Sequence, residues 1–399
     1  MEHPIIDSDT HVNEPPDLWV SRLASKFRDR APRVIDGSWG GKAWSSDIGR
    51  TMAINMLINT AGVSPTEWQL IPKDGYASMR PGAWDPQARI ADMDIDMIDV
   101  HVMFPSYAFL VTASKDRELH RALIRAYNDW ISDFTTHAPD RLIAQALVPT
   151  SGVDDAIDEA KRVRNLPGVR CLVLQTWPNG GKIAKHDEDD RFWSALEDLD
   201  LAVCAHVGFN IAGEAMDHMD DPEMLKALAT LPFIAQEKLA VDAMPILAQM
   251  ILGGVLDRHP RLRFGLIEVG VGWVPFFREQ CDDNYLRHRF WTNTHLSMPP
   301  SEFWSRQCWA TFQVDPYGIE NRHRVGVDRI LWSSDYPHAG ADWPFARERI
   351  ATQLRNVPDD ERRKILYENA CRFYGLDSPD LAKRLGYSPL PAVGAHPPS

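Results

Sequence analysis

The chain has 399 residues, with 43 basic and 56 acidic side chains and a formal net charge of −13. Its content of 44% hydrophobic and 25% charged residues is typical of a globular protein that buries a large core. The net negative charge argues against nucleic acid and anionic membranes as partners. No apolar run approaches the ~18 residues that a membrane-spanning helix needs.

The segment after Met1 lacks the basic and apolar stretches of a secretory signal. The five cysteines are scattered and show no CxxC spacing, which argues against a disulfide framework and against a thiolate metal site. We therefore expect a cytoplasmic protein.

Short β-like runs alternate with amphipathic helical runs along the chain. Strands are predicted at 5–12, 98–104, 141–148, 169–175, 201–207, 262–268, 307–314 and 329–335. Helices are predicted at 87–97, 116–136, 153–164, 189–199, 239–257, 271–287 and 319–326. The alternation predicts parallel βαβ units, and this number of strands predicts a (β/α)8 TIM barrel. A doubly wound open sheet is the competing fold, but no GxGxxG follows the first strand.

A bare barrel takes about 250 residues, so this chain carries insertions. The largest follows strand one, at 13–85, and another follows strand five, at 210–237. Both leave the ends of strands where barrels build active sites, so we expect each to act as a wall or lid. We predict a single domain over 1–387 and a proline-rich tail without fixed structure at 388–399.

The first predicted strand carries an Asp-x-His triplet. Asp7, Asp9 and His11 point to one face because side chains alternate along a strand. Asp9 and His11 lie nearest the end of the strand, where they can bind one metal ion through oxygen and nitrogen. The triplet alone is a weak signal, and its place on the first barrel strand strengthens it.

Two further candidate ligands stand at the ends of predicted strands five and eight, His206 and Asp335. A lone histidine on an apolar strand is more often a core residue, and an aspartate before a turn can simply cap it. In a barrel, strand eight lies beside strand one, so all four side chains would converge. Two imidazoles and two carboxylates suit a divalent metal; we expect Zn²⁺, with Mn²⁺ or Fe²⁺ as alternatives.

The chain resembles the amidohydrolase superfamily, specifically the amidohydrolase-related branch that includes aminocarboxymuconate semialdehyde decarboxylase and resorcylate-type decarboxylases. The resemblance is carried by 6–15 (IDSDTHVNEP), 89–105 (RIADMDIDMIDVHVMFP), 126–134 (AYNDWISDF), 141–149 (RLIAQALVP), 206–208, 254–273, 331–338 (LWSSDYPH) and 365–376. It implies a (β/α)8 barrel with one metal ion, held by Asp9, His11, His206 and Asp335.

Three more residues are candidates near this site. Strand six ends with Glu268, where characterised decarboxylases of this branch usually have a histidine. Glu268 is interpreted as a general base, an extra metal ligand, a partner that orients His206, or a buried structural carboxylate. Glu14 is a candidate ligand of this metal or a second one, or else a carboxylate that orders a loop. His338 either faces the active-site pocket or is a loop histidine whose ring nitrogens are hydrogen-bonded locally.

The main functional hypothesis is a metal-dependent hydrolase or non-oxidative decarboxylase acting on a small carboxylated, cyclic or aromatic substrate. Asp335, Glu268 and His338 are its candidate catalytic residues. One alternative is a dinuclear Fe or Mn oxygenase, in which Glu14 and Glu268 would serve a second metal. Another is a non-catalytic partner subunit. The apolar surface of 271–287 and 291–309 suggests a homodimer or higher homo-oligomer.

Overall fold

The structure is a computed structural model of the chain, and it describes residues 3–37, 40–47, 51–54, 59–64, 66–67, 70–109, 114–209 and 243–388. The predicted insertion at 210–237 and nearly all of the predicted tail at 388–399 lie outside these residues. No helix in the described ranges combines the length and the apolar character needed to cross a membrane.

Eight parallel strands form one sheet whose order follows the chain, so each strand pairs with its sequence neighbours. They are β1 (Ile6–His11), β5 (Val100–Phe104), β6 (Leu142–Leu147), β7 (Val169–Leu174), β8 (Ala202–His206), β9 (Phe264–Ile267), β10 (Cys308–Phe312) and β11 (Ile330–Trp332). The predicted (β/α)8 barrel and all its strands are confirmed, and each strand is one to four residues shorter than predicted.

The barrel closes through backbone hydrogen bonds just beyond the last strand. The amide of Asp335 donates to the carbonyl of Asp9 at 3.0 Å, and the amide of His11 donates to the carbonyl of Tyr336 at 2.6 Å. Strand eight is therefore shorter than predicted, because Asp335 already lies in the turn that follows β11. The closure joins two candidate metal-binding segments directly.

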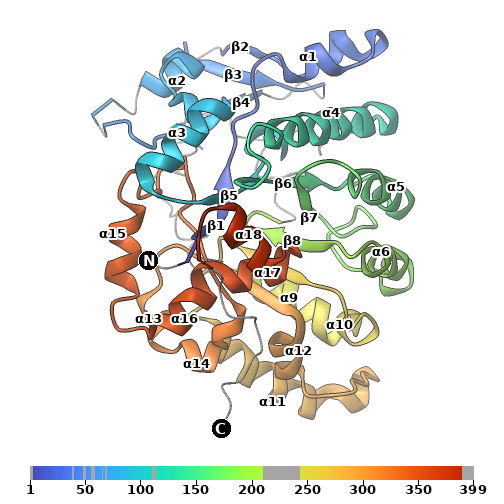
Figure 1. The fold of residues 1–399 in the computed structure, drawn as a ribbon. Helices are drawn as coiled ribbons and strands as arrows, with labels where there is room; N and C mark the ends of the chain where they lie inside the picture. The colour runs from blue at the N-terminus through green and yellow to red at the C-terminus, as the bar shows by residue number, and fades with distance from the viewer. Residues whose placement is uncertain are drawn as a thin grey trace.

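Helices surround the sheet on its outer side (Figure 1). The longer ones are α3 (Pro86–Asp96), α4 (Arg117–Thr135), α5 (Val153–Val163), α6 (His186–Leu199), α9 (Ala243–Leu252), α11 (Val274–Thr292), α12 (Pro300–Gln307) and α15 (Ala346–Gln353). The shorter ones are α10 (Val255–Arg258), α13 (Pro316–Glu320), α14 (Arg322–Val325), α16 (Asp359–Arg363), α17 (Asn369–Tyr374) and α18 (Ser378–Arg384). Single turns are η3 (Gly75–Ala77), η4 (Pro81–Ala83), η7 (Val327–Arg329) and η8 (Lys364–Glu368).

The prediction of one continuous helix at 239–257 is wrong over residues 243–257, the part that the structure describes. This part is divided into α9 and α10 at Gly254, which has a positive φ of 72°. Only glycine adopts this left-handed conformation without steric cost, so the helix ends there and a new one begins. Likewise, the predicted helix at 319–326 is replaced by the two short helices α13 and α14.

The insertion after β1 forms a small antiparallel sheet of β2 (Val34–Asp36), β3 (Lys42–Ser45) and β4 (Thr51–Ala53), with α1 (Leu18–Arg22), η1 (Ser25–Arg30) and α2 (Leu70–Asp74). Trp19 and Trp44 pack edge to face with ring centroids 5.2 Å apart. The Trp19 indole donates to the carbonyl of Leu123 in α4, and Trp44 packs against Tyr107. These buried rings attach the insertion to the barrel.

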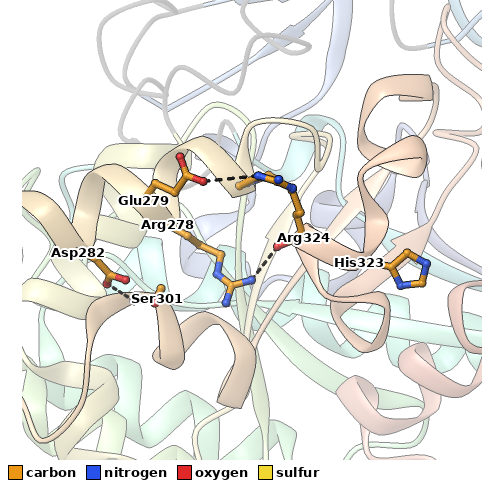
Figure 2. Close-up of a pocket in the computed structure, with 7 residues that line it drawn as sticks. Arg278, Glu279, Asp282, Ser301, His323 and Arg324 are labelled. Atoms are coloured by element: carbon orange, nitrogen blue, oxygen red, sulfur yellow. Dashed lines mark hydrogen bonds and ion pairs between the residues drawn. The ribbon is translucent and has the colours of Figure 1, made fainter.

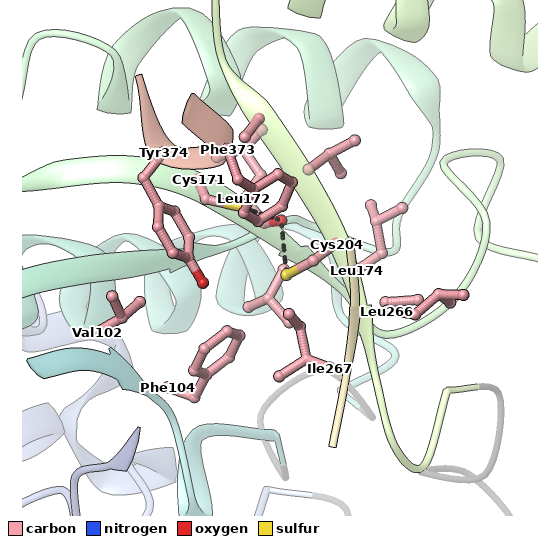
Figure 3. Close-up of a cluster of buried hydrophobic side chains, with 14 of the residues drawn as sticks. Val102, Phe104, Cys171, Leu172, Leu174, Cys204, Leu266, Ile267, Phe373 and Tyr374 are labelled. Atoms are coloured by element: carbon pink, nitrogen blue, oxygen red, sulfur yellow. Dashed lines mark hydrogen bonds between the residues drawn. The ribbon is translucent and has the colours of Figure 1, made fainter. Parts of the chain in front are cut away.

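Residues of α17 pack against apolar side chains of the barrel strands (Figure 3). Tyr374 donates a hydrogen bond to the carbonyl of Ser8 at 2.9 Å, and the rings of Phe373 and Tyr374 lie near Cys171 and Cys204. A Cβ on Gly265 would approach the Phe373 ring to 2.5 Å, so a glycine is required there. The polar side chains His11 and His206 lie at the carboxyl ends of their strands.

Candidate metal centre

Four candidate ligands meet at the carboxyl ends of the strands. His11 and His206 are the last residues of β1 and β8, and Asp9 precedes His11 by two positions on the same side of the strand. Asp335 follows β11 with a φ of 62°. Non-glycine residues rarely adopt this conformation, and it is typical of functional sites.

The ligand atoms of these residues face one another. The Nε2 atom of His206 lies 3.5 Å from Oδ1 of Asp9, and Nε2 of His11 lies 3.6 Å from the same oxygen. His11 Nε2 is also 3.6 Å from Oδ1 of Asp335. All four residues are at most 4% exposed. This places two imidazole nitrogens and two carboxylates around one buried position.

Backbone carbonyls fix the orientation of both imidazoles. Nδ1 of His11 lies 2.9 Å from the carbonyl oxygen of Pro105, and Nδ1 of His206 lies 3.1 Å from that of Val207. A carbonyl oxygen only accepts, so each Nδ1 carries a proton, and Nε2 is the atom of each imidazole that faces the centre and can bind a metal ion. This is the arrangement in which metal-binding histidines are usually held.

Several of these buried atoms lack a hydrogen-bond partner among the described residues: Nε2 of His11, Nε2 of His206 and both carboxylate oxygens of Asp9. Unpaired buried polar atoms are costly, and a bound cation would satisfy them together. The donor set therefore fits a divalent metal ion of the Zn²⁺ or Mn²⁺ class.

The two imidazoles differ in their proton affinity. Burial and the proximity of His338 and His206 hold the pKa of His11 well below its ordinary value. Burial acts in the same direction on His206, but the adjacent carboxylate of Asp9, with the charge of Glu268, raises the pKa of His206 to about 9. In the metal-free cluster His206 is thus protonated on both ring nitrogens, with Nε2 near the carboxylates of Asp9 and Glu268, and a bound metal ion would take the place of the Nε2 proton.

Glu268 and His338 adjoin the same centre. Glu268 follows β9 with a φ of 63°, and its Oε2 lies 3.4 Å from Nε2 of His206. His338 stacks on His11 with ring centroids 3.9 Å apart, and its Nδ1 lies 2.8 Å from Oδ1 of Asp335. Burial lowers the pKa of His338 to about 3, so this imidazole is neutral. Both residues belong to groups whose ligand atoms lie within 4.8 Å of one another.

Glu14 is not brought to this centre. Its carboxylate accepts backbone N–H groups of Ser106, Tyr107 and Ala108, at 3.2, 2.7 and 3.0 Å. Glu14 belongs to neither group of potential metal ligands in the described part of the chain. These contacts match the loop-ordering alternative, because both carboxylate oxygens are already used by the loop.

Two residues near the centre are not predicted from the sequence, Arg89 and Tyr336. The fully buried guanidinium of Arg89 donates to the carbonyl of His11 and lies 4.6 Å from the ring of Tyr336. The hydroxyl of Tyr336 donates to Asp92 at 2.5 Å. The sequence pattern that could have indicated them is the spacing of polar residues in α3. Arg89, Asp92 and Asp96 recur at intervals of three and four residues, which places them on the buried face of the helix.

A second surface feature is an open groove of about 360 Å³ between α11, α12 and α14 (Figure 2). Its charged groups are engaged with their neighbours: Arg278 donates to the carbonyl of Arg324 and to Ser305, and Arg324 pairs with Glu279. No candidate ligand lines this groove. It lies on the outer helical layer, and its lining residues come from α11, α12 and α14.

The comparisons with known proteins decide the family. The amidohydrolase family model called Amidohydro_2 matches residues 6–376. The chain belongs to this family. A curated relative, gamma-resorcylate decarboxylase of Rhizobium sp. strain MTP-10005, is 28% identical over 327 residues, which cover 77% of this chain and 92% of the relative.

Solved structures of family members share the fold. A crystal structure of an amidohydrolase from Mycobacterium avium subsp. paratuberculosis K-10 superposes with a TM-score of 0.70 at 21% identity, covering 94% of this chain and 100% of the other. A 5-carboxyvanillate decarboxylase from Novosphingobium aromaticivorans, complexed with manganese, gives a TM-score of 0.66 at 18% identity and covers 94% and 96% of the two chains. The predicted family, an enzyme of the metal-dependent hydrolase and carboxy-lyase class, is confirmed.

Proposed function

We propose that this amidohydrolase is a metal-dependent non-oxidative decarboxylase of a small hydroxylated aromatic carboxylate. The observation that carries the proposal is the buried set of Asp9, His11, His206 and Asp335, whose inward-facing nitrogens and oxygens converge on one point. The relatives that are named for resorcylate and carboxyvanillate decarboxylation support the substrate class.

These four residues would hold one divalent ion, and we propose Zn²⁺ or Mn²⁺. Two imidazoles favour Zn²⁺, whereas two carboxylates with open positions also suit Mn²⁺, the ion named for the carboxyvanillate enzyme. When bound, the ion supplies a Lewis acid that holds anionic substrate oxygens. The site lies at the carboxyl ends of the strands, where barrel enzymes receive small substrates.

The proton required by the reaction is assigned to Asp335 and His338. In the overall step, one proton is added to the ring carbon that bears the carboxylate, and carbon dioxide leaves. The pair of electrons from the broken carbon–carbon bond restores the aromatic ring. Asp335 would deliver the proton to the ring carbon. The neutral imidazole of His338, whose Nδ1 lies 2.8 Å from Oδ1 of Asp335, would then pass a proton from solvent to Asp335.

Hydrolysis is a second candidate because of Glu268. A carboxylate stands at the end of strand six, where the decarboxylases of this branch usually have a histidine, and it is 3.4 Å from His206 Nε2. This position suits a general base for water attack on a carbonyl. The oxygenase alternative is weakened, because the Glu14 carboxylate is hydrogen-bonded to the loop after β5. The partner-subunit alternative is weakened because the potential metal ligands are retained: Asp9, His11 and His206 group with Glu268, and Asp335 groups with His11, Glu268 and His338.

The test is an assay of purified protein loaded with Zn²⁺ or Mn²⁺ against a panel of ortho-hydroxylated benzoates and matched esters and amides. We expect carbon dioxide release from a benzoate, and about one metal ion per chain by elemental analysis. The variants His206→Ala and Asp335→Asn should remain folded, lose the metal and lose activity. Full metal content in both variants would refute the ligand assignment, and hydrolysis without carbon dioxide release would favour the second candidate.

We further propose that the protein acts in the cytoplasm as a homodimer. The location is supported by five buried cysteines, none of which forms a disulfide bond. The dimer is supported by large apolar side chains exposed near the end of α11.

A further inference from the structure

Glu14 is a fully buried carboxylate on the segment that follows β1. Its two oxygens accept three consecutive backbone N–H groups, those of Ser106, Tyr107 and Ala108, at 2.7 to 3.2 Å. Burial raises the pKa of Glu14 to about 7, so the carboxylate is ionised above that pH, where hydrogen bonds to it are about twice as strong as those to a neutral acceptor. One side chain therefore holds the first turn of the loop that follows β5.

The residues on either side of this tripeptide contact the two imidazoles of the metal centre. Pro105, immediately before it, accepts the Nδ1–H of His11 at 2.9 Å. Phe109, immediately after it, packs on the ring of His206 with centroids 6.0 Å apart. A displacement of the tripeptide would thus move the contacts of both histidines together.

Glu14 is itself held in place from the other side. The hydroxyl of Tyr76 donates to its backbone carbonyl, so the insertion after β1 fixes the main chain at this position. The loop is also tied back, because Asn13 donates to the side chain of Asn59 and Asn59 donates to the hydroxyl of Tyr107 at 2.9 Å. The carboxylate is therefore a rigid link between the segments that follow β1 and β5.

We propose that Glu14 is a positioning residue that sets the affinity of the metal centre without binding the metal. It would act by holding the loop 105–109 so that the carbonyl of Pro105 keeps the Nδ1 proton on His11 and directs Nε2 inward. This inference rests on the proposed metal centre and is independent of the reaction that the centre carries out.

The test compares the metal affinity of Glu14→Gln with that of the wild type. The amide keeps the shape of the side chain but turns one acceptor into a donor that faces backbone N–H groups. We expect the dissociation constant for Zn²⁺, measured on metal-free protein against a chromophoric chelator at about pH 8, to rise ~10–100-fold. The electronic spectrum of the Co²⁺-loaded variant should also change, because the orientation of His11 is altered.

Glu197→Gln is the matched control. Glu197 is a mostly buried carboxylate at the other end of the barrel, where it accepts the N–H of Arg261 at 2.6 Å before β9. The same chemical change there should leave Zn²⁺ affinity and the Co²⁺ spectrum unchanged. Glu14→Asp, which keeps an anionic acceptor, should bind Zn²⁺ more tightly than Glu14→Gln.

Three outcomes would overturn the inference. The first is a folded Glu14→Gln variant with wild-type Zn²⁺ affinity, and the second is an equal loss of affinity in Glu197→Gln. The third needs no variant: rapid hydrogen–deuterium exchange of the amides at 106–108 in the metal-free wild type would show that the loop is not held. If the wild type binds no metal, the proposed metal centre is refuted. The exchange experiment would still measure whether Glu14 holds the amides at 106–108.

Discussion

Glu268 and Asp335 show how single residues are placed at this site. Each follows a barrel strand directly or within three positions, and each adopts a left-handed backbone conformation, with φ of 63° and 62°. The amide of Glu268 donates to the hydroxyl of Thr311 at 2.7 Å, which stabilises this turn. The strained turns direct both carboxylates toward the imidazoles instead of along the next loop.

We predict that Glu268→Gln keeps the metal and loses hydrolytic turnover. The amide preserves the volume of the side chain and its backbone conformation, but it cannot accept or return a proton. We expect about one metal ion per chain and a decrease of ~10²–10⁴-fold in the kcat of hydrolysis. The kcat of decarboxylation should decrease less, because its proton is assigned to Asp335 and His338. Near wild-type turnover would instead assign Glu268 to a structural role, and loss of the metal would make it a ligand.

Helix α3 connects the metal centre to the outer layer. Its buried face carries Arg89 against His11, Asp92 against Tyr336, and Asp96, whose carboxylate accepts the first amide of α15, that of Ala346, at 2.8 Å. Asp92 also receives a two-point hydrogen bond from Arg80 in the insertion after β1. One polar face therefore joins the insertion, the strand-eight turn and the next helix.

We predict a pH-dependent stability effect at Asp96. Burial, together with the nearby carboxylates Asp342 and Asp92, raises its pKa from 3.8 to about 6. The folded state thus favours the neutral acid, so this stabilisation is complete below about pH 4 and is lost as pH rises through 6. The free energy of unfolding of Asp96→Asn should exceed that of the wild type by about 2 kcal/mol at neutral pH, and the difference should be small at about pH 4. Denaturant unfolding at a series of pH values measures this difference.

The control for this prediction is Asp94→Asn on the same helix. Asp94 is 63% exposed and pairs with Arg141 at the surface, so its stability difference from the wild type should be small. A difference for Asp96→Asn that stays constant from acid to neutral pH would contradict the assignment of the titration to this residue.

At the scale of the whole molecule, the end of α11 presents an apolar surface. Leu286, Phe290 and Trp291 are 60%, 77% and 75% exposed. Covering such side chains is worth about 25 cal/mol per Å² of apolar area. We predict a dimer by multi-angle light scattering, and a shift to monomer in Phe290→Glu, because a charge there would have to be buried in the interface.

The light-scattering experiment has a direct control in Phe276→Glu, a substitution nearer the start of α11 at a residue 59% exposed. If only the end of the helix is the interface, this variant stays dimeric. A monomeric wild type at working concentration would contradict the homodimer.

The fold was predictable because its signals are local. The barrel strands after β1 are mostly apolar, and helical segments separate each strand from the next, so the strand-helix pattern recurs along the chain. Errors occurred where a single residue changes the backbone: Gly254 divides the helix at 239–257, and the turn at Asp335 ends β11 early. Positive φ at such positions is not encoded in hydrophobic periodicity.

The family, the barrel and the candidate residues Asp9, His11, His206 and Asp335 could be inferred from the amino-acid sequence, because strand-end positions converge in a barrel. The contacts of the neighbouring carboxylates could not be inferred in this way and are known from the folded chain alone. Glu268 and Glu14 are equally plausible in sequence, yet the first faces His206 and the second faces three backbone amides. The physical reason is that a carboxylate goes to whichever buried donors its loop geometry presents, and these donors come from distant segments of the chain.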